Sequence, residues 1–573
     1  MKFNSQGDQS VTYDAIVVGT GISGGWAAKE LCEKGLRVLV LEKGRMVKHG
    51  DYPTANLDTW DLPYHGAVPH EEVREHYNKL IRAGYPVHQS CKDWFVRDDE
   101  HPYSEKRQFD WVRGYHVGGR SIMWGRHSYR WSDLDFSANA REGIGTPWPV
   151  DYAEIAPWYD YVETFAGISG ERRGLSQLPD GQFLPMMPLN CAEEKFKQGT
   201  EKEMGRAVTA GRVAHLTAYD PAVHKGTRGQ CQFRNRCIRG CPYGGYFSSV
   251  SSTLPVAEAT GNLTLQPNSS VYSLVMDKER GRARGVRYRN TETGQDAEAY
   301  AKVVFLCASA IPSSFIVMNT EHEEGITLDR SGELGGNIMD HHFRVGASGY
   351  TDEFPDQYYK GRKPNGIYIP RYQNLGDRRS KSKDFLRGWG YQGGAGRSGW
   401  EQAVREMSVK PGPDLKKAIL QPGHWEMGMT AFAEVLPDTN NRMTINRDLL
   451  DKDGLPTMTF DAAWGENELA MVEAMKNDAA EMLEAAGFRG VETFDRHSKP
   501  GLGIHEMGMA RMGGSAKNSV VDKYNRLWAA PNVYLTDGAF MTSSACVNPS
   551  LTYMAFTARA ADHAVGELKK MNI

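Results

Sequence analysis

Apolar and polar positions at the start of the chain follow the pattern of a βαβ unit. An apolar run at 15–18 indicates a buried strand, and it leads directly into a G-x-G-x-x-G turn at 19–24. Beyond the turn, apolar side chains recur at helical spacing on one face, and Gly35 is a typical helix stop. A second apolar run follows at 36–41. The pattern therefore predicts a strand, a tight turn, a helix and a parallel strand within residues 13–43.

Further along the chain, alternation and helical spacing predict a second set of elements. Two alternating runs at 264–288 flank a charged, glycine-containing turn, which is typical of a hairpin. From about 340 to 465 the segments alternate and are rich in aromatic residues, which indicates an antiparallel sheet that includes 425–435 and 442–445. The other periodic stretches are a buried strand at 302–306, an amphipathic helix at 466–486, a strand at 533–536 and a closing helix from about 553 to 570. We therefore expect two sheets of different kinds.

Composition excludes several classes of protein. The chain has 573 residues and a formal net charge of −3, so we expect two or three intertwined domains and no nucleic-acid partner. No apolar run approaches the length of a membrane span. The N-terminus, MKFNSQGDQSV, lacks a basic region followed by an apolar core, so we expect no signal peptide of its own. The expected location is the cytoplasm, or the periplasm through co-export with a partner subunit.

The first glycine turn carries recognisable chemistry. Gly19 permits a tight turn, Gly21 allows the backbone to approach a pyrophosphate, and Gly24 allows the helix to pack closely on the strand. The helix N-terminus then directs unpaired N–H groups at the phosphates. Glu42, at the end of the second strand, can accept hydrogen bonds from a ribose and would repel a 2′-phosphate. The motif favours FAD or NAD over NADP, but it does not separate FAD from NAD.

A second glycine-rich turn lies at 118–121, between aromatic residues. These flanks indicate a backbone pressed against a flat ring, although a purely structural turn explains the same residues. The preceding stretch, 51–100, is rich in His, Tyr, Pro and charge and has little periodicity. We expect this stretch to be an excursion across the surface or into an interface, with an ordinary lid or loop as the alternative.

Three of the eight cysteines, Cys231, Cys237 and Cys241, lie close together and are followed by Pro242. Three thiolates on a tight loop suit an iron–sulfur cluster, because soft sulfur ligands can surround one face of it. A three-ligand set favours a 3Fe–4S cluster over a 4Fe–4S cluster, unless a fourth ligand comes from elsewhere. The alternatives are a structural zinc site without an obvious fourth ligand, a disulfide with one spare thiol, and packed cysteines.

Five stretches, in order, resemble the glucose–methanol–choline (GMC) family of FAD oxidoreductases. They are the N-terminal βαβ unit, VGGRSIMWGR at 117–126, LGGNIMDHH at 334–342, HEMGMARMG at 505–513, and NVYLTDGAF followed by NPSLTYMAFTARAAD at 532–562. The resemblance covers most of the chain. It is this resemblance, rather than the glycine motif, that implies FAD instead of NAD.

The resemblance implies an α/β fold, α+β overall, with a Rossmann-like FAD-binding domain and an inserted antiparallel-sheet substrate domain. Such an architecture is typical of GMC and pyranose-oxidase-like enzymes. The FAD-binding domain would consist of 1–50, 101–335 and 500–573, and it would carry the cysteine-rich loop at 228–245. The substrate-binding domain would be 336–499, and 51–100 would be the surface or interface excursion.

By resemblance, His505 and Asn548 are the catalytic pair. A neutral imidazole can take the hydroxyl proton while the carbon-bound hydrogen leaves as hydride to flavin N5, and the asparagine can donate a hydrogen bond to the same oxygen. The other implied positions contact the cofactor: Gly118, Gly119, Ser121, Met123, Trp124, Val271, Asp537 and Gly538, in addition to Gly19, Gly21, Gly24 and Glu42. Some pyranose-oxidising relatives attach FAD covalently through a histidine where this chain has Met123, so we expect non-covalent FAD.

The cysteine segment is similar to that of the iron–sulfur-containing sugar, gluconate and glucoside dehydrogenase catalytic subunits. This similarity implies a dehydrogenase that oxidises a secondary alcohol of a sugar or glycoside, with glucoside 3-dehydrogenase as the leading hypothesis. Electrons would leave through the cluster to a cytochrome or quinone, with a small subunit and a cytochrome c-type acceptor as partners. The alternatives are an oxygen-using pyranose or glycoside oxidase of the same fold and a non-catalytic flavin electron-transfer module.

Overall fold

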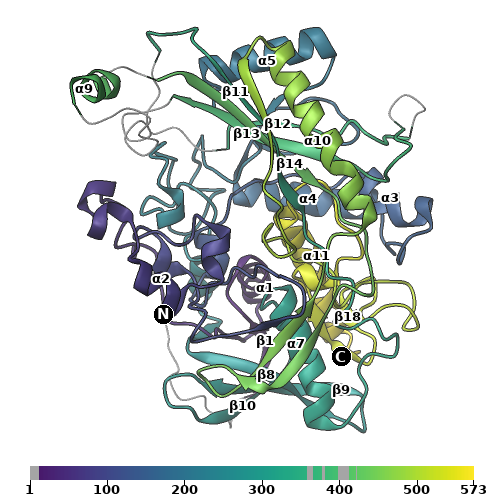
Figure 1. Ribbon diagram of the computed structural model, residues 1–573. Helices are drawn as coiled ribbons and strands as arrows, with labels where there is room; N and C mark the ends of the chain where they lie inside the picture. The colour runs from purple at the N-terminus through teal and green to yellow at the C-terminus, as the bar shows by residue number, and fades with distance from the viewer. Residues whose placement is uncertain (1–11, 358–364, 377–380, 398–411, 421–422) are drawn as a thin grey trace.

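The computed structural model describes residues 12–357, 365–376, 381–397, 412–420 and 423–573. The expectation about a signal peptide concerns MKFNSQGDQSV, which lies outside the described residues. Two large sheets organise the described chain, one mostly parallel and one antiparallel (Figure 1), which confirms the mixed α/β fold. Within the described residues, no helix is both long enough and apolar enough to cross a bilayer.

The first sheet joins the beginning, the middle and the end of the chain. β1 (Thr12–Val18) runs parallel to β2 (Val38–Leu41) on one side and to β10 (Asp296–Leu306) on the other. At its two ends the sheet continues through β7 (Leu263–Gln266), β19 (Ala530–Leu535) and β18 (Arg526–Leu527). Because parallel strands end at the same edge, the turns that follow β1, β10 and β19 lie near one another.

Helices from both ends of the chain pack together beside this sheet. α1 (Ile22–Glu33) directly follows the glycine turn, as predicted, and ends near Gly35, whose φ of 88° lies in the left-handed region. It contacts α6 (Thr253–Ala259) and the closing helix α11 (Ser550–Lys569), which in turn contacts α4 (Tyr152–Ala166). The N-terminal βαβ unit is therefore completed by the C-terminus.

The predicted hairpin is present, but it begins later than the pattern indicates. β8 (Ser269–Asp277) and β9 (Arg282–Asn290) pair antiparallel, β9 continues onto β10, and α7 (Ala310–Glu324) packs on β8. The first residues of the predicted hairpin belong to β7, which pairs parallel with β2. Asn268, at φ 55°, turns the chain between β7 and β8. Pro267 and Asn268 are typical turn residues, so the sequence carries a signal for this break that the predicted hairpin did not use.

The second sheet is antiparallel. In spatial order its strands are β17 (Arg489–Asp495), β11 (His342–Thr351), β14 (Trp425–Ala433), β13 (Trp389–Arg397), β12 (Ile367–Ile369) and β6 (Thr209–Ala210). The predicted amphipathic helix, α10 (Glu466–Ala485), packs its buried methionines against this sheet. In Figure 1 the second sheet and α10 lie above the first sheet.

One segment packs away from the domain to which the sequence assigns it. β6 and α5 (Cys191–Met204) fall in the range expected to belong to the FAD-binding domain. In the structure, α5 packs against α10, and β6 pairs with β12 of the second sheet. Phe196 of α5 is fully buried with the residues of that sheet, so the burial of this apolar face explains the placement.

A second segment belongs to a different sheet from the one that the sequence predicts. The pattern places 442–445 in the second sheet, but β15 (Arg442–Leu450) pairs with β16 (Pro456–Asp461), which pairs with β3 (Ser104–Glu105). Phe460 of β16 stacks on Phe109 at a centroid distance of 4.2 Å, so the small sheet packs against the segment that follows β3. The remaining regular elements are short or peripheral: α2 (His70–His76), α3 (Asp133–Glu142), β4 (Ile168–Ser169), β5 (Phe183–Leu184) and α9 (Pro413–Leu420).

Candidate active site

A cavity of about 600 Å³ opens where the parallel strands of the first sheet end, and residues of the second sheet line its other side. The predicted catalytic and cofactor-binding residues line this cavity, with the exception of Gly24 and Gly118. Both exceptions have a structural reason. A Cβ at Gly24 would lie 2.0 Å from the Gly19 carbonyl oxygen, and a Cβ at Gly118, at φ 95°, would lie 2.7 Å from the side chain of Val250.

The dinucleotide end of the cavity is formed by backbone. Gly19 adopts φ 95°, and α1 begins directly after Gly21. Among the described residues, no side chain caps this helix N-terminus, and none lies within 4 Å of the position that a Cβ would take at Gly21. Open space and uncapped N–H groups at a helix N-terminus suit a pyrophosphate. The residues present therefore fit the dinucleotide that the sequence predicts.

Glu42 lies at the same end, but its carboxylate is already engaged. One oxygen accepts hydrogen bonds from the Thr20 N–H at 3.1 Å and the Thr20 hydroxyl at 2.5 Å, and the other accepts from the Gly44 N–H at 3.0 Å. Burial raises the pKa of Glu42. The carboxylate thus holds two loops at the cavity wall, while its predicted contact with a ribose stays a prediction.

The second glycine turn lies directly against the first. A Cβ at Gly119 would lie 3.4 Å from the Gly21 Cα. The Ser121 hydroxyl donates to the Gly118 carbonyl at 2.5 Å and accepts from the Ser249 N–H at 3.0 Å, so this side chain holds the turn in shape. Met123 and Trp124 follow at the cavity wall. The two glycine turns therefore form one continuous surface.

Asp537, Gly538 and Val271 complete the cofactor side. Asp537 accepts hydrogen bonds from the Ser313 hydroxyl at 2.5 Å and the Ala539 N–H at 3.0 Å, and burial raises its pKa to about 6. A Cβ at Gly538 would lie 2.1 Å from the Glu506 carbonyl oxygen, so this position requires glycine. Val271, on β8, lies on the wall of the same cavity.

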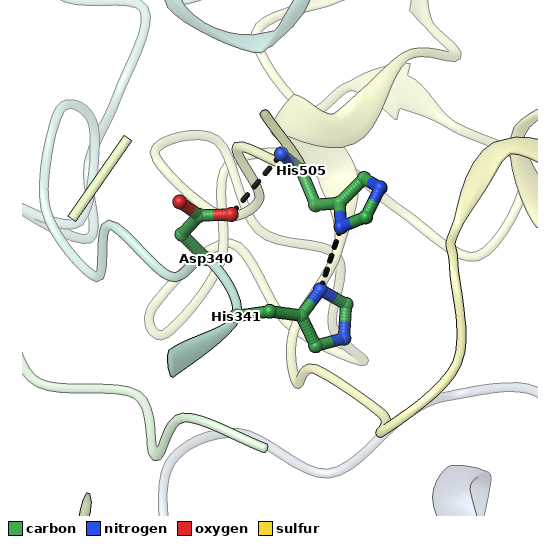
Figure 2. A group of neighbouring side chains, drawn as sticks. All are labelled: Asp340, His341 and His505. Atoms are coloured by element: carbon green, nitrogen blue, oxygen red, sulfur yellow. Dashed lines mark hydrogen bonds between the residues drawn. The ribbon is translucent and has the colours of Figure 1, made fainter. Parts of the chain in front are cut away.

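The structure brings the two predicted catalytic residues together. The Asn548 Nδ2 lies 3.0 Å from the His505 Nε2. On the other side of the ring, the His505 Nδ1 lies 2.8 Å from the Nδ1 of His341, a residue that precedes β11 (Figure 2). The His341 Nε2 lies 2.5 Å from the Ala545 carbonyl oxygen. Four groups, from three segments that are distant in the sequence, therefore form one continuous chain of hydrogen bonds.

These contacts determine which nitrogens carry protons. A carbonyl oxygen can only accept, so the His341 Nε2 must donate to Ala545, and the neutral His341 Nδ1 must accept. The His505 Nδ1 then donates to His341, which leaves the His505 Nε2 with a lone pair. Asn548 donates to that lone pair, and its Oδ1 accepts from the Gln392 Nε2 at 2.6 Å. The basic nitrogen of His505 is therefore the one that faces Asn548.

Charged groups surround His505 without pairing with its ring. Asp340 accepts hydrogen bonds from the backbone N–H groups of His505 at 3.1 Å and Gly503 at 2.7 Å. Burial and the nearby carboxylate of Glu506, which pairs with Arg120 at 2.8 Å, together raise the pKa of Asp340 to about 7. Burial lowers the pKa of His505 well below its usual range, and His341 and Arg120 lower it further. The imidazole is therefore neutral near neutral pH and can accept a proton.

Sequence reasoning missed three residues of this region. His341 and Asp340 lie within LGGNIMDHH, one of the stretches that resemble the GMC family. This motif could therefore have indicated that they belong to the site. Gln392 lies in the middle of β13 and has no local signal in the sequence. Its place beside Asn548 depends on how the second sheet packs over the first.

The three clustered cysteines line a separate cavity of about 30 Å³ together with His215 and Tyr246. Each is a free thiol, and the His215 Nδ1 lies 3.6 Å from the Cys231 sulfur. Ile238, in the turn between Cys237 and Cys241, lines the large cavity. The two cavities are therefore neighbours, separated by the wall of one turn.

Comparisons with known proteins agree with this geometry. Two family models, both described as GMC oxidoreductase, match residues 13–343 and 437–557. The chain is 28% identical to 2-methyl-1,2-propanediol dehydrogenase of Mycolicibacterium austroafricanum, over 96% of this chain and 94% of that protein. It is 25% identical to the fructose dehydrogenase large subunit of Gluconobacter japonicus, over 98% of this chain and 99% of that protein.

A solved structure of a formate oxidase variant from Aspergillus oryzae RIB40 superposes with a TM-score of 0.61 at 14% identity, covering 98% of this chain and all of that chain. This similarity shows the shared fold. The model matched at 13–343 spans more than half of the chain by itself. The chain therefore belongs to the GMC oxidoreductase family of FAD-dependent enzymes that act on CH–OH donors.

Proposed function

We propose that this enzyme is a dehydrogenase that oxidises a secondary alcohol of a sugar or glycoside and passes the electrons through an iron–sulfur cluster to a cytochrome or quinone. Oxidation of a glucoside at C3 is the leading assignment. The observation that carries the electron route is the shared wall between the two cavities, where Ile238 lies between Cys237 and Cys241 and also lines the flavin cavity. The Tyr246 hydroxyl links the same two regions, because it donates to the carbonyl oxygens of Cys237 and Ile122.

The catalytic end suits removal of a hydroxyl proton. The substrate hydroxyl would displace Asn548 from the lone pair of the His505 Nε2, which would accept the proton, and the Asn548 Nδ2 would then donate a hydrogen bond to the substrate oxygen and fix its direction. When bound, FAD supplies a hydride acceptor at N5. His505 is half-buried at the cavity wall, so a bound substrate would complete the exclusion of water from the proton transfer. Met123 stands where some relatives have a linking histidine, which supports non-covalent FAD.

The substrate side of the cavity suits a pyranose ring. Phe343 and Phe432 stack at a centroid distance of 5.2 Å and both line the cavity, which provides an apolar face for the ring. Gln392 and Asn365 line the same cavity and offer hydrogen-bonding groups for hydroxyls. An apolar face with polar groups beside it is the arrangement that sugars require.

The cysteine loop supports a cluster over a zinc ion. Zinc binds thiolates at about 2.3 Å in tetrahedral geometry, which would draw the sulfur atoms to within about 3.8 Å of one another. The three thiols are not among the groups in the described chain whose ligand atoms all lie within 4.8 Å of one another. Three cysteines on one tight loop favour the 3Fe–4S form of the cluster.

The proposed partners are a small subunit and a cytochrome c-type acceptor. The similar fructose dehydrogenase protein is named a large subunit, which supports a multi-subunit assembly for this chain as well. We place the enzyme in the cytoplasm, or in the periplasm by co-export with such a subunit. The division into a FAD-binding domain at 1–50, 101–335 and 500–573 and a substrate domain at 336–499 belongs to the same proposal, except that α5 and β6 pack on the second sheet.

Anaerobic flavin reduction with a panel of sugars and glycosides, combined with iron analysis and EPR on the same sample, tests the proposal. We expect methyl glucosides to bleach the flavin, and we expect iron and a cluster signal. In Cys231→Ser, the signal should be lost and turnover with a one-electron acceptor should fall, while bleaching persists; Cys191→Ser on α5 is the matched control. Iron-free protein that oxygen reoxidises rapidly would favour an oxidase, and absence of bleaching would favour a non-catalytic module.

A further inference from the structure

Gln392 is a polar side chain of the cavity wall, next to Asn548. On β13 it lies in register with Thr430 of β14, while Gly390, two residues earlier, lies in register with Phe432. Residues that face each other in neighbouring antiparallel strands point to the same side of the sheet, so Gln392 shares a side with Phe432. The adjacent Tyr391 points the other way and donates to the Met475 carbonyl of α10. The Gln392 side chain therefore faces the flavin cavity, which it lines.

The hydrogen bonds of the site determine how the Gln392 carboxamide is turned. Asn548 must present its Nδ2 to the lone pair of His505, so its Oδ1 faces Gln392. The Gln392 Nε2 therefore donates to Asn548, and the Gln392 Oε1 is left as an acceptor. No donor from the described residues reaches this oxygen, and it is not among their buried polar atoms without a partner. The oxygen is therefore available to a ligand in the cavity.

We propose that the Gln392 Oε1 accepts a hydrogen bond from a second hydroxyl of the substrate, on the carbon next to the one that is oxidised. The substrate class is then vicinal diols, including sugar rings, rather than isolated alcohols. The alcohol oxygen to be oxidised would lie at the His505 Nε2 and the Asn548 Nδ2, and the carboxamide of Asn548 connects these atoms to Gln392. A hydroxyl on the adjacent carbon would then be the substrate group directed at Gln392. This inference rests on the proposed alcohol oxidation.

The Gln392 Oε1 is suited to discriminate between substrates with and without the second hydroxyl. A site built to hydrogen-bond a hydroxyl rejects an analogue that lacks it, because the acceptor of the site is left unpaired. An aromatic wall alone would hold the diol and the mono-alcohol with similar affinity. Gln392 also orients Asn548, so its removal should affect both the rate of proton transfer and the recognition of the second hydroxyl. Two variants separate these effects.

The experiment measures anaerobic flavin reduction with matched pairs of substrates on the FAD-loaded enzyme. The pairs are methyl α-glucopyranoside with its 2-deoxy and 4-deoxy analogues, and 1,2-propanediol with 1-propanol and 2-propanol. In the wild type we expect the second-order rate of reduction to favour the intact diol by about 100-fold or more. In Gln392→Leu, which lacks both groups, this preference should fall to about threefold or less, with FAD still bound.

Gln392→Glu keeps acceptor oxygens but cannot donate to Asn548. We expect it to retain most of the preference for the diol while the rate falls. Asn548 should turn its oxygen toward His505, which favours the imidazolium, so the acid limb of the pH–rate profile should move to higher pH. Thr430→Val, on the neighbouring strand, is the matched control and should keep the wild-type preference. If Gln392→Leu fails to bind FAD, Gln392→Asn, whose shorter amide cannot reach both partners, replaces it.

The outcomes separate the two proposals. Reduction of the wild-type flavin by diols and their deoxy partners at equal rates overturns the role of Gln392 and leaves the dehydrogenase assignment intact. An undiminished preference in Gln392→Leu also overturns it. A wild-type flavin that no member of the panel reduces overturns the proposed function, and the inference falls with it.

Discussion

The two ends of the flavin cavity are built in different ways. At the dinucleotide end the surface is backbone: Gly21 opens onto free space, and α1 begins beside it without a side-chain cap. At the catalytic end the surface is a directed chain of side-chain hydrogen bonds that runs from His341 through His505 and Asn548 to Gln392. Cofactor binding at the first end depends on the space that the backbone leaves. Proton transfer at the second end depends on which atoms carry protons.

Because of this difference, substitutions at the two ends should change different properties. A side chain added at the backbone end alters the space available to the cofactor, whatever its chemistry. A substitution at the side-chain end leaves that space intact but alters the proton positions on His505. Cofactor binding and reaction rate should therefore be separable, and four predictions test this separation in order of decreasing effect.

The largest effect is expected at Gly24. In Gly24→Ala the new Cβ would lie 2.0 Å from the Gly19 carbonyl oxygen, so helix and strand must move apart. We expect the free energy of unfolding to fall by about 3 kcal/mol and FAD binding to be lost. Gly21→Ala is the matched variant, because its Cβ meets open space: stability of the FAD-free protein should stay within about 0.5 kcal/mol while FAD affinity falls at least about tenfold. Urea unfolding and FAD titration measure both, and equal behaviour of the two variants would contradict the assignment.

The next largest effect is expected at His505. In His505→Ala the proton acceptor is lost, so we expect anaerobic flavin reduction to slow by about 100-fold to 10,000-fold. FAD affinity should remain within about threefold of the wild type, because the dinucleotide end is untouched. Stopped-flow bleaching at saturating substrate gives the rate. Unchanged bleaching would reject His505 as the base, and loss of FAD would show that the two ends are not separable.

A smaller effect is expected at His341, which acts through His505. His341→Asn places an amide oxygen near the position of the native Nδ1 and can still accept from His505, whereas His341→Leu cannot. We expect flavin reduction to slow about 10-fold to 100-fold in the leucine variant and to recover partly in the asparagine variant. The same stopped-flow measurement compares them. Equal rates in the two variants would mean that His341 only fills space.

The smallest effect concerns pH. Because the pKa of His505 lies well below its usual range, the imidazole stays neutral as the pH falls toward 6.5. Flavin reduction in the wild type should therefore be nearly flat from about pH 8 to about pH 6.5, and the rate should be lost only as the pH falls through the lowered pKa. A half-maximal rate near pH 6.5 or above would contradict the enclosed, neutral histidine.

The sequence predicted much of the dinucleotide end, because its parts are consecutive. Strand, glycine turn, helix and second strand follow one another within thirty-odd residues, and Gly19, Gly21 and Gly24 each have a local geometric reason that a motif records. His505 and Asn548 came from a family resemblance, and the structure places them 3.0 Å apart, atom to atom. Their partners were not predicted, because a contact between distant segments leaves no local pattern.

The errors have the same origin. The alternation at 442–445 predicts a strand but not its partner, which is β16 rather than a strand of the second sheet. The apolar face of α5 likewise predicts a helix, but only its packing against α10 shows that this helix lies on the second sheet. Periodicity describes one element at a time, whereas pairing depends on two.

The sequence alone was therefore sufficient for most of the elements and for the dinucleotide turn, since these rest on neighbouring residues. The assignment of His505 and Asn548 as the catalytic pair rests on motifs in order and stays a prediction. Tertiary structure alone decided the tautomer of His505, the orientation of Gln392 and the shared wall between the flavin cavity and the cysteine loop. The physical reason is that hydrogen bonds are directional. Which atom donates depends on every partner in the chain of contacts, and those partners meet only after both sheets have packed.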